Sequence, residues 1–203
     1  MQCWKDLPRI DQSRCRVCAS PWNVRATSDR YTCLACRDRD WQLVWIDSWG
    51  HYRDGLEKLL HAFKFGRHDF LARPLGDLLH EVLDKRHDTF FDAIVPVPMH
   101  PKKMRRRGYN QAELLASALH RTTGIPVRTC LRKRVDNETQ SRLPKSARAD
   151  NVRDVFVAGR GLDGERFLLV DDICTTGETL AAAARALSRA GAGSVSALTV
   201  ARA

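Results

Sequence analysis

The sequence has no long apolar run, although hydrophobic residues make up 43% of its 203 residues. A membrane-spanning helix needs about 18 or more consecutive apolar residues, and no stretch of this chain comes near that length. The segment Met1–Pro8 likewise has no apolar core of a secretion signal. We therefore expect a cytoplasmic protein without membrane insertion, with one domain or one domain and a small module.

Metal-ligand spacing is absent among the histidines, which are scattered along the chain, but it is present among the cysteines. Cys15 and Cys18 form one C-x-x-C pair, and Cys33 and Cys36 form a second pair 14 residues later. Each two-residue spacing lets a turn direct both sulfurs at one ion. Cytoplasmic thiols stay reduced, which favours metal over disulfides. We predict a closed, structural zinc site.

Residues 1–45 would then form a zinc module, and residues 46–203 a separate domain. So short a segment has little core of its own, so zinc would supply much of its folding free energy.

The positive charge of the chain is concentrated in one zone. Between Lys102 and Arg153 lie 14 Lys and Arg residues and 4 Asp and Glu residues, an excess equal to the +10 of the whole chain. Such a zone predicts a polyanionic partner: the phosphates of a small ligand, of nucleic acid, or both. A basic face that serves only solubility is the alternative. Residues 132–148 lack hydrophobic periodicity, and we interpret them as a flexible lid or as a basic loop without a role.

Three tryptophans, Trp41, Trp45 and Trp49, are spaced four residues apart. This spacing fits a nucleic-acid stacking platform, but aromatic residues at such intervals more often pack in a core, and we favour packing.

Apolar stripes at helical spacing predict two helices, over 56–63 and 71–82. The polar connection Lys64–His68 joins them. Lys64 is a candidate phosphate ligand, although a surface position is the favoured interpretation.

The stretch Phe167–Val170 has no polar alternation and predicts a strand buried on both faces, typical of a parallel sheet. Asp171 and Asp172 follow it, and then come the small-residue loop Thr175–Thr179 and the Ala-rich helix Leu180–Leu187. A helix N-terminus exposes unpaired N–H groups that suit a phosphate, and the threonine hydroxyls add donors. The acidic pair is placed to bind the hydroxyls of an attached sugar or its Mg²⁺.

A second strand–loop–helix unit precedes this one. Phe91–Pro98 predicts a short buried strand, and Ala112–Leu119 predicts a helix. The predicted loop Met99–Gln111 between them carries five cations, at the sheet edge where anions bind. The candidate ligands of a pyrophosphate or DNA phosphate are Arg105, Arg106, Arg107, Gly108, Tyr109, Asn110 and Gln111.

The run 167–179 resembles the phosphoribosyl pyrophosphate (PRPP) signature of type I phosphoribosyltransferases. The resemblance implies an α/β core with a mostly parallel, twisted sheet flanked by helices. It also implies that Asp171 and Asp172 are the catalytic pair and contact the ribose hydroxyls of Mg²⁺-bound PRPP. The loop that wraps the 5-phosphate would consist of Thr175, Thr176, Gly177, Glu178 and Thr179.

The whole chain resembles one family more narrowly, the ComF (ComFC-like) competence proteins. The resemblance is carried in order by the cysteine quartet, Val95–Pro101, Arg107–Ala112, Thr139–Ser141, Asn151–Val152 and the PRPP run. It implies a PRPP-binding protein of natural transformation that handles incoming single-stranded DNA in the cytoplasm, alongside a helicase-like partner. Tyr109 stands where the common form has Phe, which adds a hydroxyl.

Two alternatives stay open. The first is a metabolic phosphoribosyltransferase that transfers ribose 5-phosphate from PRPP to a nucleobase-like acceptor, with Arg105–Arg107 and the metal stabilising the transition state. The sequence shows no clear nucleobase pocket, which would have to come from the zinc module and the region 41–49. The second is a non-enzymatic regulator that senses PRPP and docks a partner through the zinc module.

Overall fold

The computed structural model describes residues 4–10, 14–20, 31–39, 41–86, 90–134 and 155–203. Residues 135–148 of the predicted lid and the blocks Thr139–Ser141 and Asn151–Val152 lie outside the described residues.

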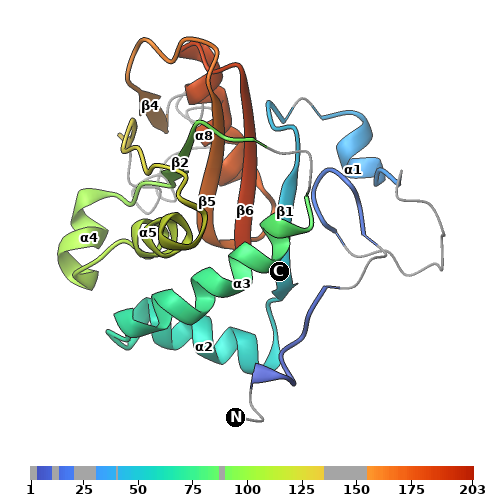
Figure 1. Cartoon of the computed structure of the whole chain (residues 1–203), viewed down its shortest axis with the longest axis vertical. Coiled ribbons are helices and arrows are strands. Elements are labelled where there is room, and N and C mark those ends of the chain that lie inside the picture. Colours follow the sequence, from blue (N-terminus) through green and yellow to red (C-terminus); the bar gives the residue numbers. More distant parts are fainter. Residues whose placement is uncertain (1–3, 11–13, 21–30, 40, 87–89, 135–154) are drawn as a thin grey trace, which may run out of the picture.

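A four-stranded parallel sheet forms the centre of the molecule, with its strands in the order β1-β6-β5-β2 (Figure 1). A two-stranded antiparallel sheet, β3-β4, lies beside it. The strand bounds are β1 Ile46–His51, β2 Ala93–Pro96, β3 Leu131–Lys133, β4 Phe156–Ala158, β5 Arg166–Cys174 and β6 Ser194–Arg202. The side chains of Phe167–Val170 in β5 are fully buried, which confirms the predicted strand with two covered faces.

Helices cover both faces of the sheet (Figure 1). Leu168 and Val170 of β5 belong to the cluster formed with α2, α3 and α5, and Phe167 and Leu169 belong to the cluster formed with α8. The helix bounds are α1 Leu34–Arg37, α2 Asp54–Phe65, η2 Asp69–Leu71, α3 Ala72–Asp84, α4 Pro101–Arg107, α5 Gln111–Thr123 and α8 Glu178–Arg189. The predicted α/β class with a parallel sheet flanked by helices is therefore confirmed. None of the described helices combines the length and the apolar character needed to cross a membrane.

Helices α3 and α5 pack unusually closely. A Cβ atom on Gly76 of α3 would lie 2.5 Å from the Cβ of Ala118 in α5. Since real Cβ atoms do not come so near, a glycine is required at this crossing.

The segment Met99–Gln111 is not only a loop, as predicted, because Pro101–Arg107 form the helix α4. The His100 side chain accepts the N–H of Lys102 at its start, and Gly108 ends it with a φ of 93°. No side chain of α4 is buried. The helix therefore leaves no apolar stripe in the sequence, which is why periodicity did not indicate it.

The three tryptophans are core residues, which confirms the packing interpretation. Trp41, Trp45 and Trp49 are 5–6% exposed. An arginine guanidinium lies over each ring, at 4.0–5.6 Å from the ring centroid. These rings have no free face on which a base could stack.

The cysteine segment, whose described residues are 14–20 and 31–39, packs on the same core. Cys15, Cys18 and Cys36 belong to the apolar cluster that includes α8 and β6. Asp47 of β1 is fully buried, and its Oδ2 lies 3.1 Å from Arg14 Nη2, within the cysteine segment, and 2.7 Å from Arg86 Nη2. Two arginines from distant parts of the chain thus neutralise one buried carboxylate, which ties the segment to β1.

Candidate functional site

The acidic pair lies within β5, which continues to Cys174, whereas the sequence placed the pair directly after a strand at Phe167–Val170. The last residue of β2, Pro96, pairs with Val170. Strand β6 continues to pair with β5 as far as Cys174, so residues 171–174 extend beyond β2 with β6 still beside them. The chain leaves β2 toward α5 on one face and β5 toward α8 on the other, a divergence that forms a binding crevice at the carboxyl edge of parallel sheets.

Asp172 faces Lys64 at this edge. The Asp172 residue is 6% exposed, and its Oδ2 lies 3.2 Å from Lys64 Nζ. This ion pair lacks hydrogen-bond geometry, and Oδ2 accepts no hydrogen bond within the part of the chain that the structure describes. Lys64, in the last turn of α2, is therefore held against the acidic pair, where the sequence had favoured a surface position.

Asp171 is partly buried, and its Oδ1 accepts the N–H of Asp172 at 2.8 Å. Burial, followed by the neighbouring Asp172 carboxylate, raises the pKa of Asp171 from 3.8 to about 8. Two adjacent carboxyl groups supply the hard oxygen donors that Mg²⁺ prefers. The residues present therefore fit a magnesium ion and sugar hydroxyls.

The loop that follows leads into α8 through Gly177. Its φ is 81°, and a Cβ at this position would lie 2.6 Å from Trp41 Cζ3. Thr175, Thr176 and Thr179 are exposed around the first turn of α8, where the N–H groups of a helix start attract anions. The structure thus brings the predicted phosphate loop directly after the acidic pair.

The Glu178 side chain forms an ion pair with Arg39, unlike the exposed threonines of the same loop. Its Oε1 lies 2.8 Å from Arg39 Nη1, and the Arg39 guanidinium also lies 4.9 Å from the Trp41 ring centroid. The backbone N–H of Glu178, which donates to Thr176 Oγ1 at 3.4 Å, belongs to the loop, whereas its carboxylate is directed toward the cysteine segment.

Three of the predicted phosphate ligands, in the connection between α4 and α5, form hydrogen bonds with the backbone of neighbouring segments. Tyr109 donates its hydroxyl to Phe63 O, Asn110 Nδ2 donates to Val97 O at 3.1 Å, and Gln111 Nε2 donates to Lys64 O at 3.4 Å. These side chains position the last turn of α2 beside the end of β2. Their role as phosphate ligands stays a prediction.

The arginines of α4 divide into two groups. Arg105 and Arg106 are exposed. Arg107 is half-buried, donates to Gln111 Oε1 at 2.6 Å and lies 5.0 Å from the Phe65 ring centroid. A small pocket of about 140 Å³ is lined by Lys64, Phe65, Arg67, Arg106 and Arg107.

The four cysteines converge on one point. Their sulfur atoms all lie within 4.8 Å of one another, and the Cys18 and Cys33 sulfurs are 3.7 Å apart. Tetrahedral coordination with zinc–sulfur bonds of about 2.3 Å requires sulfur separations of about 3.8 Å. The four residues therefore fit one tetrahedral metal ion, and the predicted cysteine cluster is confirmed.

The protein environment helps to ionise one of these thiols. Burial raises the pKa of Cys15, but the backbone N–H groups of Cys33, Cys18 and Val17 outweigh that effect and lower it to about 7. One of these groups, Cys33 N–H, donates to Cys15 Sγ at 3.3 Å. The thiolate is the form that binds a metal.

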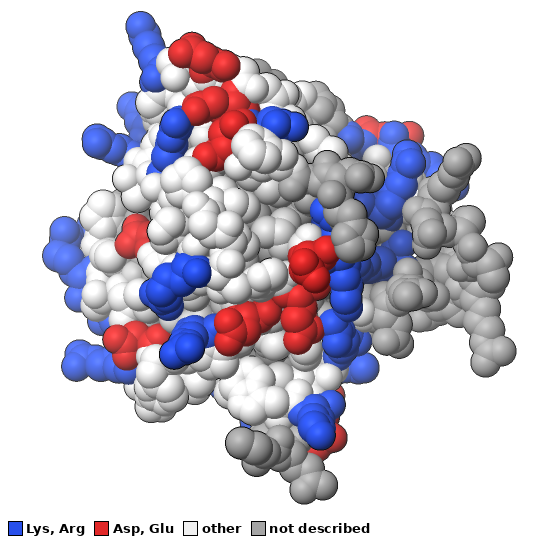
Figure 2. Space-filling view, viewed as in Figure 1, with Lys and Arg blue, Asp and Glu red and all other residues white. Residues whose placement is uncertain are grey.

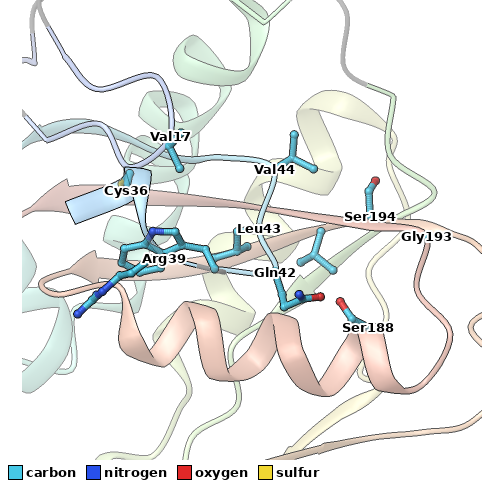
Figure 3. Close-up of a pocket in the computed structure, with 11 residues that line it drawn as sticks. Val17, Cys36, Arg39, Gln42, Leu43, Val44, Ser188, Gly193 and Ser194 are labelled. Atoms are coloured by element: carbon cyan, nitrogen blue, oxygen red, sulfur yellow. The ribbon is translucent and has the colours of Figure 1, made fainter. Parts of the chain in front are cut away.

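A larger pocket of about 430 Å³ lies between the cysteine segment and the C-terminal half of α8 (Figure 3). Ser188, Gly193 and Ser194 line it at the end of α8 and the start of β6. This is the amino edge of the sheet, opposite the acidic pair. Although Trp41 also lines it, the pocket does not extend the crevice at Asp171.

The family of phosphoribosyl transferase domains matches residues 81–203, a range that contains β2, β5, β6, the acidic pair and the loop after it. The chain belongs to this family.

Its relatives narrow the assignment to the ComF family. Competence protein F of Haemophilus influenzae is 35% identical over 162 residues, which cover 76% of this chain and 71% of that protein. Competence protein ComFC of Bacillus subtilis is 30% identical over 202 residues, 98% of this chain and 82% of the relative. The DNA utilization protein YhgH of Escherichia coli K12 is 34% identical over 196 residues, 92% and 83% of the two chains. These matches confirm the resemblance noted in the sequence.

Removal of one cysteine of the cluster tests the metal site. We expect Cys15→Ser to lose bound metal, measured by elemental analysis. The melting temperature should fall by roughly 10 °C, equivalent to about 3–5 kcal/mol for a chain of this length. Cys130→Ser, at a half-buried cysteine outside the cluster, is the control and should keep both metal and stability. A Cys15→Ser protein with full metal content and an unchanged melting temperature would contradict the assignment.

The raised pKa of Asp171 predicts a pH-dependent stability. Between pH 4 and pH 8 the folded protein holds a proton that the unfolded chain releases, so wild-type stability falls as the pH rises through this window. Asp171→Asn removes that loss and should raise the melting temperature more at pH 8 than at pH 5. Asp77→Asn, an exposed aspartate in α3, should show no such difference. Parallel pH profiles for Asp171→Asn and wild type would refute the shift.

Proposed function

We propose that this chain binds PRPP with Mg²⁺ at Asp171 and Asp172 and that it handles single-stranded DNA during DNA uptake, in the cytoplasm. The observation that carries the PRPP site is the acidic pair at the carboxyl end of β5, where the buried Oδ2 of Asp172 forms an ion pair with Lys64 but accepts no hydrogen bond from the described residues. This oxygen lies at the open edge of β5, and a phosphate-binding loop and helix start follow it. In the same proposal the cysteine cluster holds zinc as a structural ion, and a helicase-like partner acts with the protein.

Each part of PRPP has a matching group in this arrangement. The threonine hydroxyls and N–H groups of 175–179 suit the 5-phosphate. The acidic pair suits the ribose hydroxyls and the metal, which neutralises the pyrophosphate when bound. Lys64 forms an ion pair with Asp172, and Arg107 is close enough to interact electrostatically with both carboxyl groups. Arg107 adds a planar fork of donors suited to phosphate oxygens.

The DNA part of the proposal rests on surface charge and on the relatives. Two relatives are named competence proteins and a third a DNA utilization protein. In Figure 2, basic side chains lie along the left margin, where α4 is placed in Figure 1. A band of acidic side chains crosses the face over α3 in the same view. A polyanion would follow the basic margin and avoid this band.

Phosphoribosyl transfer is a second candidate, favoured by the match to the phosphoribosyl transferase domain. In that reaction the bond between C1 and the pyrophosphate oxygen of PRPP breaks, pyrophosphate leaves with its electron pair, and a nucleophile bonds to C1. Release of pyrophosphate from PRPP in the presence of a base or of DNA would establish transfer. Binding without release would restrict the role to recognition.

Replacement of both carboxylates tests the PRPP site. We expect Asp171→Asn with Asp172→Asn to weaken PRPP binding in Mg²⁺ by at least about 100-fold in calorimetry, because each charged hydrogen bond contributes about 1.5–3 kcal/mol. The variant should keep the metal content of the cysteine cluster. Asp77→Asn is again the control and should bind like wild type. Unchanged PRPP binding by the double variant would refute the assignment of the acidic pair.

Neutralising α4 tests the DNA surface. We expect Arg105→Gln with Arg106→Gln to weaken binding of single-stranded DNA and to reduce the slope of log affinity against log salt by about 1.4, since each phosphate contact contributes about 0.7. PRPP binding should persist. Lys58→Gln with Arg73→Gln, two exposed cations on α2 and α3, is the matched control. Equal effects of the two pairs would show that only net charge matters.

A further inference from the structure

A row of exposed rings borders the α4 surface. The aromatic strip consists of His61, Phe65, His68 and Phe70, all exposed, in the last two turns of α2 and the segment through η2. Phe65 is 57% exposed and Phe70 is 68% exposed. The rings lie in two pairs, with centroids 4.9 Å apart for His61 and Phe65 and 5.4 Å apart for His68 and Phe70.

The exposure of Phe65 does not follow from the core pattern of its helix. The buried stripe of α2 contains Leu56, Leu60 and Phe63. At about 100° per residue, Phe65 lies roughly 200° around the helix from Phe63, on the opposite face. A polar side chain at this position would cost the core nothing, whereas an exposed phenylalanine leaves apolar surface in water. Core packing of α2 therefore does not explain a phenylalanine at position 65.

Cations alternate with these rings. The Arg107 guanidinium lies 5.0 Å from the Phe65 ring centroid, and Phe65 shares its small pocket with Lys64, Arg67 and Arg106. Asp69 adds one negative charge within η2. Aromatic faces set among basic side chains are the arrangement that binds single strands, because bases stack on rings while the cations neutralise phosphates.

We propose that the aromatic strip is the base-stacking platform for single-stranded DNA, with Phe65 and Phe70 as the stacking side chains and Arg67 and Arg106 on the phosphates. This inference rests on the proposed DNA-handling function and specifies where the strand lies. Charge complementarity identifies the occupant, since an apolar protein surface would not need the surrounding arginines. Because Lys64 contacts Asp172 at 3.2 Å, a strand on the platform lies next to the acidic pair.

The test compares two sets of exposed phenylalanines. Phe90 is 60% exposed, and the Arg166 guanidinium lies 4.6 Å from its ring centroid. It therefore reproduces the Phe65–Arg107 pair, but it precedes β2 at the amino edge of the sheet. Affinity for a labelled oligothymidine is measured by fluorescence anisotropy over a salt series for wild type, Phe65→Ala with Phe70→Ala, Phe65→Tyr with Phe70→Tyr, and Phe90→Ala. Melting temperatures confirm that each variant is folded.

We expect the double alanine variant to lose at least about 25-fold in affinity, because stacking contributes a factor of about five or more per base. Its salt slope should stay unchanged, since no phosphate contact is removed. The tyrosine variant and Phe90→Ala should bind like wild type.

Other outcomes overturn the inference in distinguishable ways. Unchanged affinity of the double alanine variant would refute the stacking platform while the DNA-handling function stands. A change in self-association with equal DNA affinity would assign the aromatic strip to a second copy of the chain. An equal loss in Phe90→Ala would show a non-specific effect of surface phenylalanines. Failure of the wild type to bind DNA at all would refute the proposed function and the inference with it.

Discussion

The unequal pairing of β5 with its two neighbours determines the candidate site. Strand β6 accompanies β5 to Cys174, whereas β2 ends at Pro96 opposite Val170. The two carboxyl groups are thus carried on a rigid strand and still border open space at the edge of the sheet. A turn would not hold Asp172 so deeply buried beside Lys64. Burial disfavours the charged form of Asp171 and raises its pKa, and repulsion from the adjacent Asp172 carboxylate adds to this effect.

The segment that follows the cysteine quartet packs against the predicted phosphate loop 175–179. Trp41 follows the cysteine quartet in the chain, and its ring fills the space that a Cβ on Gly177 would occupy. Arg39 extends the same contact by stacking on Trp41 and pairing with Glu178. The cysteine segment therefore covers the first turn of α8 from behind. A metal ion held by the four cysteines would in this way influence the proposed phosphate loop without touching it.

The polar block Tyr109–Gln111 positions neighbouring segments of the chain through its side-chain hydrogen bonds. Its side chains bond to the backbone of α2 and of the residue after β2. These bonds bring Lys64 and the exposed face of Phe65 to the acidic edge. The corner between α4 and α5 thus connects the candidate PRPP site with the basic surface and the aromatic strip, and the two proposed anions, PRPP and DNA, would meet there.

Features set by local pattern could be read from the sequence alone: the buried run Phe167–Val170, the helical stripes, the cysteine quartet at its ligand spacing and the loop before α8. Each depends on neighbouring residues, whose periodicity and chemistry are visible in the chain. Tertiary structure alone decided how far β5 extends, since its last residue, Cys174, pairs with Arg202 of β6, 28 residues later in the chain. It also decided that Lys64 lies beside Asp172, which is 108 residues away in the chain. The helical form of α4 was likewise not visible in the sequence, because none of its residues is fully buried. Contacts between distant segments determine these features, and no local pattern encodes them.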